Sequence, residues 1–176
     1  MELKKLYVWV EGDDDERFFN EVIKSKFIKK YNSVEIVRYA HLKREKIDNF
    51  LKSIKAMSVN YIYVADINNA PCVTDKKEKI QKEFKNINSD RIIVVIKEIE
   101  SWYLAGLDEV ISRKLGVRPF NITNTVTKEQ FNDMFSKKFA SRIDFMIEIL
   151  KCFSIEKAQE KNKSFKYFIE KYCCET

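Results

Sequence analysis

The sequence is poor in the residues that form soft-metal sites and thiol-based active sites. It contains one histidine, His41, and its four cysteines, Cys72, Cys152, Cys173 and Cys174, include no Cys-x-x-Cys pair. A structural zinc site therefore has too few suitably spaced ligands, and a Cys–His catalytic pair has only His41 to draw on. If the protein binds a metal, oxygen ligands must hold it, which favours Mg²⁺ or Mn²⁺.

The chain also lacks an apolar run long enough to span a bilayer and an N-terminal apolar segment of the secretory type. We therefore expect a cytoplasmic protein with no membrane partner. Three glycines and two prolines, beside 45% hydrophobic residues, are typical of a compact globular protein with few long loops. The length of 176 residues fits one domain, or one domain with an appended lobe.

Positive charge is in excess, with 33 lysines and arginines against 27 acidic residues. A net charge of +6 favours a polyanionic partner such as DNA or RNA, although many basic proteins bind no nucleic acid. Within the C-terminal part of the chain, the candidate phosphate-binding residues are Lys137, Lys138, Arg142 and Lys163. The sequence leaves open a protein partner or a second copy of this chain.

Residues 1–100 alternate between short apolar runs and amphipathic segments, which predicts an α/β fold. The predicted strands are 5–10, 34–40, 61–65 and 91–96, and the helices between them are 14–31, 43–57 and 75–84. Strands joined by helices form right-handed crossovers, so we expect a four-stranded, mainly parallel sheet flanked by helices.

After Ser101 the pattern is helical only. The predicted helices are 102–107, 108–115, 128–135, 138–150, 154–160 and 164–172, with a loop over 116–125. This divides the chain into an α/β core, 1–105, and a helical lobe, 106–176, packed together as a single compact unit. Trp102 and Tyr103 are expected to anchor the lobe on the sheet, and Phe165 and Phe168 to be core residues.

Acidic residues follow directly after three of the predicted strands. Glu11 comes after the first strand, Asp66 after the third, and Glu98 and Glu100 after the fourth. Parallel strands end at one edge of their sheet, so we expect these carboxylates to converge. Carboxylates in such a group repel one another unless a cation neutralises them, which favours a divalent metal. Asp13 and Asp14 fall in a first helical turn, where capping explains them.

Three motifs in this order resemble the Toprim (topoisomerase–primase) domain family, in its small stand-alone form and in the related form of overcoming-lysogenization-defect nucleases. They are VEGDDDERFF, YVADINNAP and IKEIESWYLA, and the tail SFKYFIEKY is similar to the C-terminal helix of the stand-alone form. The resemblance implies a Toprim-like fold, Glu11 as the family's glutamate and Asp15 as the aspartate after it. Asp66 matches the first position of the family's Asp-x-Asp motif, and Glu100 the closing acidic motif, with Glu98 just before it.

The chain departs from the family at Asn68, which stands at the second position of Asp-x-Asp and can ligate a metal without adding charge. The resemblance implies Mg²⁺-dependent phosphodiester hydrolysis or nucleotidyl transfer, with Glu11 as metal ligand or general acid/base. The predicted ligands are Glu11, Asp15, Asp66, Asn68, Glu98 and Glu100. A non-catalytic module that binds nucleic acid or protein, in a defence or toxin-like system, is the alternative. A regulatory domain for a small phosphorylated ligand is a third interpretation.

Overall fold

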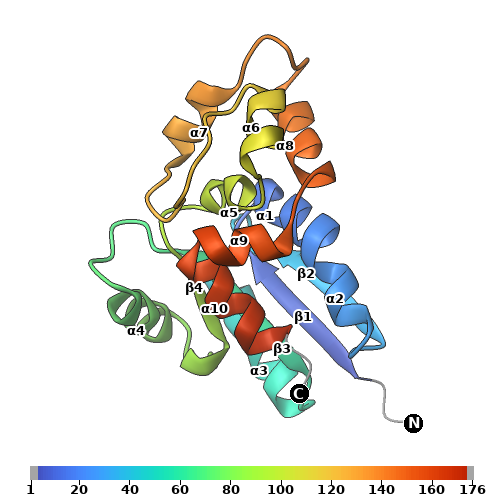
Figure 1. The fold of residues 1–176 in the computed structure, drawn as a ribbon. Coiled ribbons are helices and arrows are strands. Elements are labelled where there is room, and N and C mark those ends of the chain that lie inside the picture. The colour runs from blue at the N-terminus through green and yellow to red at the C-terminus, as the bar shows by residue number, and fades with distance from the viewer. Residues whose placement is uncertain (1–3, 174–176) are drawn as a thin grey trace. The chain divides into compact units, whose positions relative to one another are not determined.

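The computed structural model describes residues 4–173, and the chain divides into two compact units, Met1–Val94 and Val95–Thr176. Figure 1 shows both units, the first in blue to green and the second in green to red. The predicted division after residue 105 stays a prediction. No helix within the described range is long and apolar enough to cross a membrane.

A parallel four-stranded sheet forms the centre of the first unit, which confirms the predicted α/β class. The strands are β1 (Lys5–Val10), β2 (Ser33–Arg38), β3 (Asn60–Asp66) and β4 (Ile92–Val95), in the order β2-β1-β3-β4. β1 pairs with β2 on one side and with β3 on the other, so that Trp9 lies opposite Val37 and Tyr63. The predicted strand positions are correct to within one or two residues, because each strand is a distinct run of apolar and β-branched residues.

The helical segment after β1 has three parts rather than the single helix predicted over 14–31. α1 (Asp13–Phe18) continues through a π-helical turn, η1 (Phe19–Ile23), into α2 (Lys24–Ile28). The first turn of α1 is entirely acidic, from Asp13 to Glu16, which complements the helix dipole. A π turn holds one residue more than an α turn and so rotates the helix beyond it. The apolar side chains on both sides of this turn are buried: Phe18, Phe19, Val22, Ile23 and Phe27.

The two faces of the sheet are covered by different helices (Figure 1). α3 (Arg44–Ala56) and α4 (Val73–Glu83) bury apolar side chains against one face, in a single cluster that includes Trp9, Tyr63 and Ala65. Side chains alternate along a strand, so Leu6, Val8 and Val10 face the other side, toward α1 and α2. The helix after β1 and the helix after β3 therefore lie on opposite faces.

The second unit is helical. Its helices are α5 (Glu100–Ala105), α6 (Glu109–Leu115), α7 (Lys128–Met134), α8 (Arg142–Lys151), α9 (Ile155–Lys161) and α10 (Lys163–Tyr172). α8 begins later than the predicted start at residue 138, because the Ser141 hydroxyl caps it by accepting a hydrogen bond from Asp144 N at 3.0 Å.

Large aromatic side chains form the core of the second unit. Trp102 packs edge-on against Phe165 with ring centroids 5.1 Å apart and also contacts Phe168. Tyr103 lies edge-on to Phe131, with ring centroids 6.1 Å apart. All five side chains are fully buried, which confirms the predicted core role of Phe165 and Phe168. The Trp102 Nε1–H also donates to Ser164 Oγ at 2.8 Å, so its polar atom is satisfied.

Candidate functional site

The topology of the first unit marks one point on the sheet as the expected ligand crevice. β1 and β3 are parallel neighbours, and the chain leaves them toward opposite faces, through α1 and α4 respectively. In open parallel sheets, ligands bind outside the carboxyl ends of two strands that diverge in this way. The carboxyl ends of β1 and β3 are followed by Glu11 and by the segment that contains Asn68.

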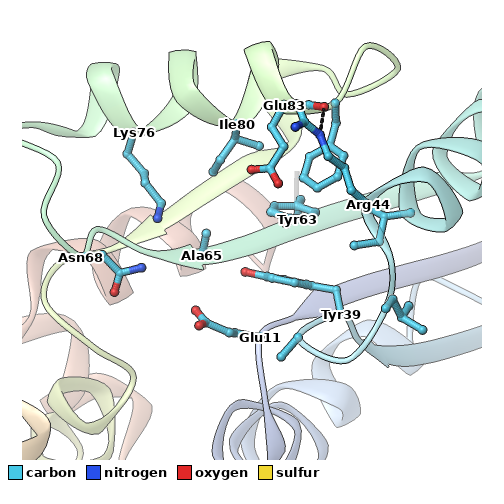
Figure 2. A pocket seen from close by; sticks show the side chains of 13 residues that line it. Glu11, Tyr39, Arg44, Tyr63, Ala65, Asn68, Lys76, Ile80 and Glu83 are labelled. Carbon is cyan, nitrogen blue, oxygen red and sulfur yellow. Dashed lines mark hydrogen bonds between the residues drawn. The ribbon is translucent and has the colours of Figure 1, made fainter.

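A pocket of about 300 Å³ lies at this switch point (Figure 2). This volume is at the lower end of the range of about 300–1,000 Å³ that is usual for small-ligand sites. The segments that follow β1, β2 and β3 contribute to it, together with α3 and α4. The described lining residues are Glu11, Tyr39, Ala40, Leu42, Arg44, Ile47, Tyr63, Ala65, Asn68, Lys76, Ile80, Glu83 and Phe84.

Three polar side chains face one another across the pocket. Figure 2 shows the Glu11 carboxylate on one side, the Lys76 ammonium on the other and the Asn68 amide at the rim between them. None of the three side chains makes a hydrogen bond or ion pair with another residue in the described part of the chain. Carboxylate, amide and ammonium groups that converge on one space without protein partners have their hydrogen-bonding capacity free for a ligand.

Asn68 adopts a left-handed backbone conformation, with φ of 50°. Asparagine tolerates this region better than most residues, since its short polar side chain can bond locally. The turn directly after β3 thus has a residue suited to its geometry, and it places the amide at the rim of the pocket.

A tyrosine pair forms the wall beside Glu11. Tyr39 and Tyr63 stack with ring centroids 4.7 Å apart and ring planes 16° from parallel. Tyr39 Oη donates to the carbonyl of Val64 at 2.9 Å. Burial raises the pKa of both hydroxyls, and the charge of Glu11 raises them further, so both stay protonated well above neutral pH.

Arg44 lines the pocket where the start of α3 meets the end of α4. Its Nε donates to the carbonyl of Glu83 at 2.8 Å, and its Nη2 to that of Lys82 at 3.4 Å. These carbonyls belong to the last turn of α4 and have no partner within the helix, so a cation there satisfies them and complements the helix dipole. Arg44 therefore fixes the start of α3 against the end of α4.

The structure places the other two predicted ligands of the first unit at the same edge of the sheet, outside this pocket. Asp15 is buried in the first turn of α1, where Oδ2 accepts a hydrogen bond from Gly12 N at 3.2 Å. Asp66 is the last residue of β3 and directly follows Ala65, which faces the pocket, so strand alternation turns Asp66 toward the opposite face. Neither is among the described residues that line the pocket.

Glu98 and Glu100 belong to the second unit, and both interact with residues of α7 or α8. Glu98 Oε2 accepts a hydrogen bond from Lys128 N at 2.5 Å, at the first residue of α7. Glu100 is 2% exposed, and its Oε1 accepts a hydrogen bond from Arg142 Nη2 at 2.7 Å. Lys128 Nζ lies 4.0 Å from the same Oε1. Each carboxylate therefore has a role in holding the helices of this unit together.

The predicted phosphate-binding residues differ in their surroundings. Lys137 and Lys163 are exposed, and Lys138 is exposed while its Nζ donates to the carbonyl of Lys114 at 2.6 Å. Arg142 is held on several sides: besides Glu100, its Nε donates to Asn132 Oδ1 at 2.7 Å and its guanidinium lies over the Phe131 ring. Arg142 thus has a structural role in this unit.

The donor set of the pocket fits Mg²⁺ better than any softer metal. Among the described residues, no group of three or more His, Cys, Asp or Glu side chains is arranged to hold a metal ion. Mg²⁺ does not require such a cage, because it keeps several waters and is usually held by one or two carboxylates together with substrate phosphates. The Glu11 carboxylate and the Asn68 amide oxygen are hard oxygen donors of this kind.

Sequence reasoning found Glu11 and Asn68 but missed Tyr39, Tyr63 and Lys76. Tyr39 directly follows β2, at the same edge as Glu11, whereas the predicted strand over 34–40 placed it within the strand, so the sequence carried no signal for it. Comparison of the chain with protein-family models, with curated proteins and with solved structures gave no match.

Proposed function

We propose that this protein is a Mg²⁺-dependent phosphoryl-transfer enzyme acting on nucleic acid, by phosphodiester hydrolysis or nucleotidyl transfer, on a Toprim-like fold in the cytoplasm. One observation carries the proposal. The Glu11 carboxylate, with no partner of its own among the described residues, faces a pocket at the switch point of a parallel sheet. The motif resemblance assigns the same glutamate to this chemistry.

Glu11 and Asn68 are the residues that would hold the metal. A bound Mg²⁺ supplies neutralisation of the phosphate charge and stabilisation of the leaving oxygen. Asn68 brings an oxygen without a charge, so the metal should bind weakly by itself and more tightly together with the anionic substrate. Asp15 lies in the first turn of α1, and its charge raises the pKa of Tyr39, so it adds to the negative potential around the pocket.

The protein's own groups have distinct tasks in this proposal. Glu11 binds the metal or carries a proton as general acid or base, as the resemblance implies. Tyr39 and Tyr63 stay neutral because burial holds their pKa values above 10, so they add no charge that would repel a phosphate. The net charge of +6 attracts the polyanionic backbone, and exposed Lys137, Lys138 and Lys163 contribute to it.

A non-catalytic module that binds nucleic acid or a protein partner, including a second copy of this chain, is the second candidate. The amide at Asn68, where the resembling family has an aspartate, favours it, because fewer charged ligands weaken hard-cation binding. In this case the pocket would bind its ligand without turnover.

The test is turnover of plasmid DNA and of single-stranded RNA with and without Mg²⁺, in the wild-type protein and in Glu11→Gln. The matched control is Glu21→Gln, an exposed glutamate on the helical segment that follows β1. We expect Mg²⁺-dependent turnover that Glu11→Gln abolishes and Glu21→Gln leaves unchanged. Salt-dependent binding without turnover on either substrate would reject catalysis and favour the binding module.

A further inference from the structure

Resting on the proposed function, we infer that Lys76 binds the non-bridging oxygens of the reacting phosphate, across the pocket from Glu11. The resemblance to the Toprim motifs gives no role to this residue, and the inference comes from its position in the pocket.

Helix α4 places Lys76 over the pocket. The helix begins after Cys72, whose Sγ accepts a hydrogen bond from Asp75 N. It buries Ile80 against the sheet, and Phe84, directly after its last residue, is buried in the same cluster. Residues four apart lie on the same face of a helix, so Lys76 shares the inward face with Ile80, one turn closer to the start of the helix. Its side chain therefore extends toward Ala65 and Asn68, as Figure 2 shows.

The ammonium of Lys76 is held near the sheet without a protein anion. No carboxylate in the described part of the chain lies within ion-pairing distance of its Nζ, and the side chain is only partly exposed. Asp75, its neighbour in sequence, accepts a hydrogen bond from the Cys72 thiol at 3.1 Å. A lysine that is partly removed from water and faces a pocket is suited to bind an anion, because its ammonium acts as a compact point charge on phosphate oxygens.

The charges of Glu11 and Lys76 define the order in which ligand groups would lie between them, while Glu83 and Arg44 line the pocket at the end of α4. A phosphate cannot approach the Glu11 carboxylate directly, since like charges repel, and a cation must lie between them. On the opposite side the phosphate meets Lys76 without an intervening ion. Phosphoryl transfer spreads negative charge over the equatorial oxygens of the phosphorus, and a fixed cation on that side stabilises this charge.

The first test measures the binding of inorganic phosphate in the presence of Mg²⁺. Binding is detected as broadening of the phosphorus NMR signal of the phosphate. The variants are Lys76→Met and Lys76→Arg, and the matched control is Lys79→Met, an exposed lysine on the same helix outside the described pocket lining. Loss of a charge-assisted contact should weaken phosphate binding about tenfold or more in Lys76→Met. Lys76→Arg should keep part of the affinity, and Lys79→Met should match the wild-type protein.

The inference is overturned if the wild-type protein shows no saturable phosphate binding, if Lys76→Met binds as the wild type does, or if Lys79→Met weakens binding equally. A thermal melt of each variant establishes that it is folded. The nuclease assay separates this result from the proposed function: if turnover is lost in Glu11→Gln but unchanged in Lys76→Met, only the role of Lys76 is rejected. If the wild type has no turnover, the phosphate titration still decides whether Lys76 binds the anion.

Discussion

Arg142 Nη2 lies 2.7 Å from Oε1 of Glu100, a carboxylate that is 2% exposed. The two residues come from α8 and α5, and the same guanidinium also bonds to Asn132 just beyond the middle of α7. The contact therefore joins three helices of the second unit, and removing the arginine takes a hydrogen bond and an opposite charge away from a buried carboxylate.

We predict that Arg142→Ala lowers the free energy of unfolding by about 3 kcal/mol, the lower end of the range for a broken buried pair, because the arginine is itself partly exposed. Urea denaturation measures the change. Arg113→Ala is the control, since Arg113 forms an exposed pair with Glu109 on α6 and should cost less than about 1 kcal/mol. Equal effects of the two substitutions would contradict a structural role for the Glu100–Arg142 pair.

Trp102→Ala should destabilise the protein by about 3–5 kcal/mol, because it removes a fully buried indole from its contacts with Phe165 and Phe168. Trp102→Phe keeps an aromatic ring but not the hydrogen bond to Ser164, and it should cost less. Thermal melts and nucleic-acid titrations of both variants check this prediction. Unchanged stability with weakened nucleic-acid binding would show instead that Trp102 stacks on a base.

Stability should fall at alkaline pH because of the buried tyrosines. Unfolded tyrosine ionises near pH 10, whereas burial raises the pKa of Tyr39 in the folded protein well above that value. Above pH 10 the folded state therefore holds more protons than the unfolded state, and stability decreases as the pH rises further. Below pH 10 the two states carry the same proton and this contribution is constant.

The variant that tests this is Tyr39→Phe, with Tyr167→Phe on the exposed face of α10 as control. Tyr39→Phe should lose about 1 kcal/mol at neutral pH with its hydrogen bond to the Val64 carbonyl, and its melting temperature should fall less steeply above pH 10. An alkaline slope identical to that of the wild type would show that Tyr39 is not among the groups that cause it.

The order of strands and helices was predictable from the sequence because each element has its own hydrophobic period. The π turn at Phe19–Ile23 was not predictable, since the buried apolar residues on both sides of it have the spacing of an ordinary amphipathic helix. The edge that carries Glu11 and Asn68 followed from parallel pairing alone. The face to which Asp66 turns depended on the pairing register, and the partner of Glu100 lies 42 residues away on another helix. Such contacts are set by tertiary packing, which leaves no local signal in the sequence.

Lys76, Tyr39 and Tyr63 were missed for a related reason. A lysine on a short charged helix has the same local pattern whether it faces solvent or a pocket, and only the packing of Ile80 and Phe84 fixes its direction. Tyrosines in or after strands are common core residues, and their relation to Glu11 depends on which strands are neighbours.

The most direct test of the central claim is a thermal melt with and without Mg²⁺ for the wild type, Asn68→Asp, Glu11→Gln and Asn69→Asp. Asn68→Asp adds a carboxylate to the pocket that holds Glu11, so the metal-free variant should melt lower, by like-charge repulsion. Mg²⁺ should raise the melting temperature of Asn68→Asp more than that of the wild type. A tenfold gain in metal affinity corresponds to about 1.4 kcal/mol of additional stabilisation at saturating metal. Glu11→Gln should lose the Mg²⁺ response, and Asn69→Asp, outside the described pocket lining, should match the wild type. A Mg²⁺ response absent from both the wild type and Asn68→Asp, or equal in Asn68→Asp and Asn69→Asp, would contradict a metal site at Glu11.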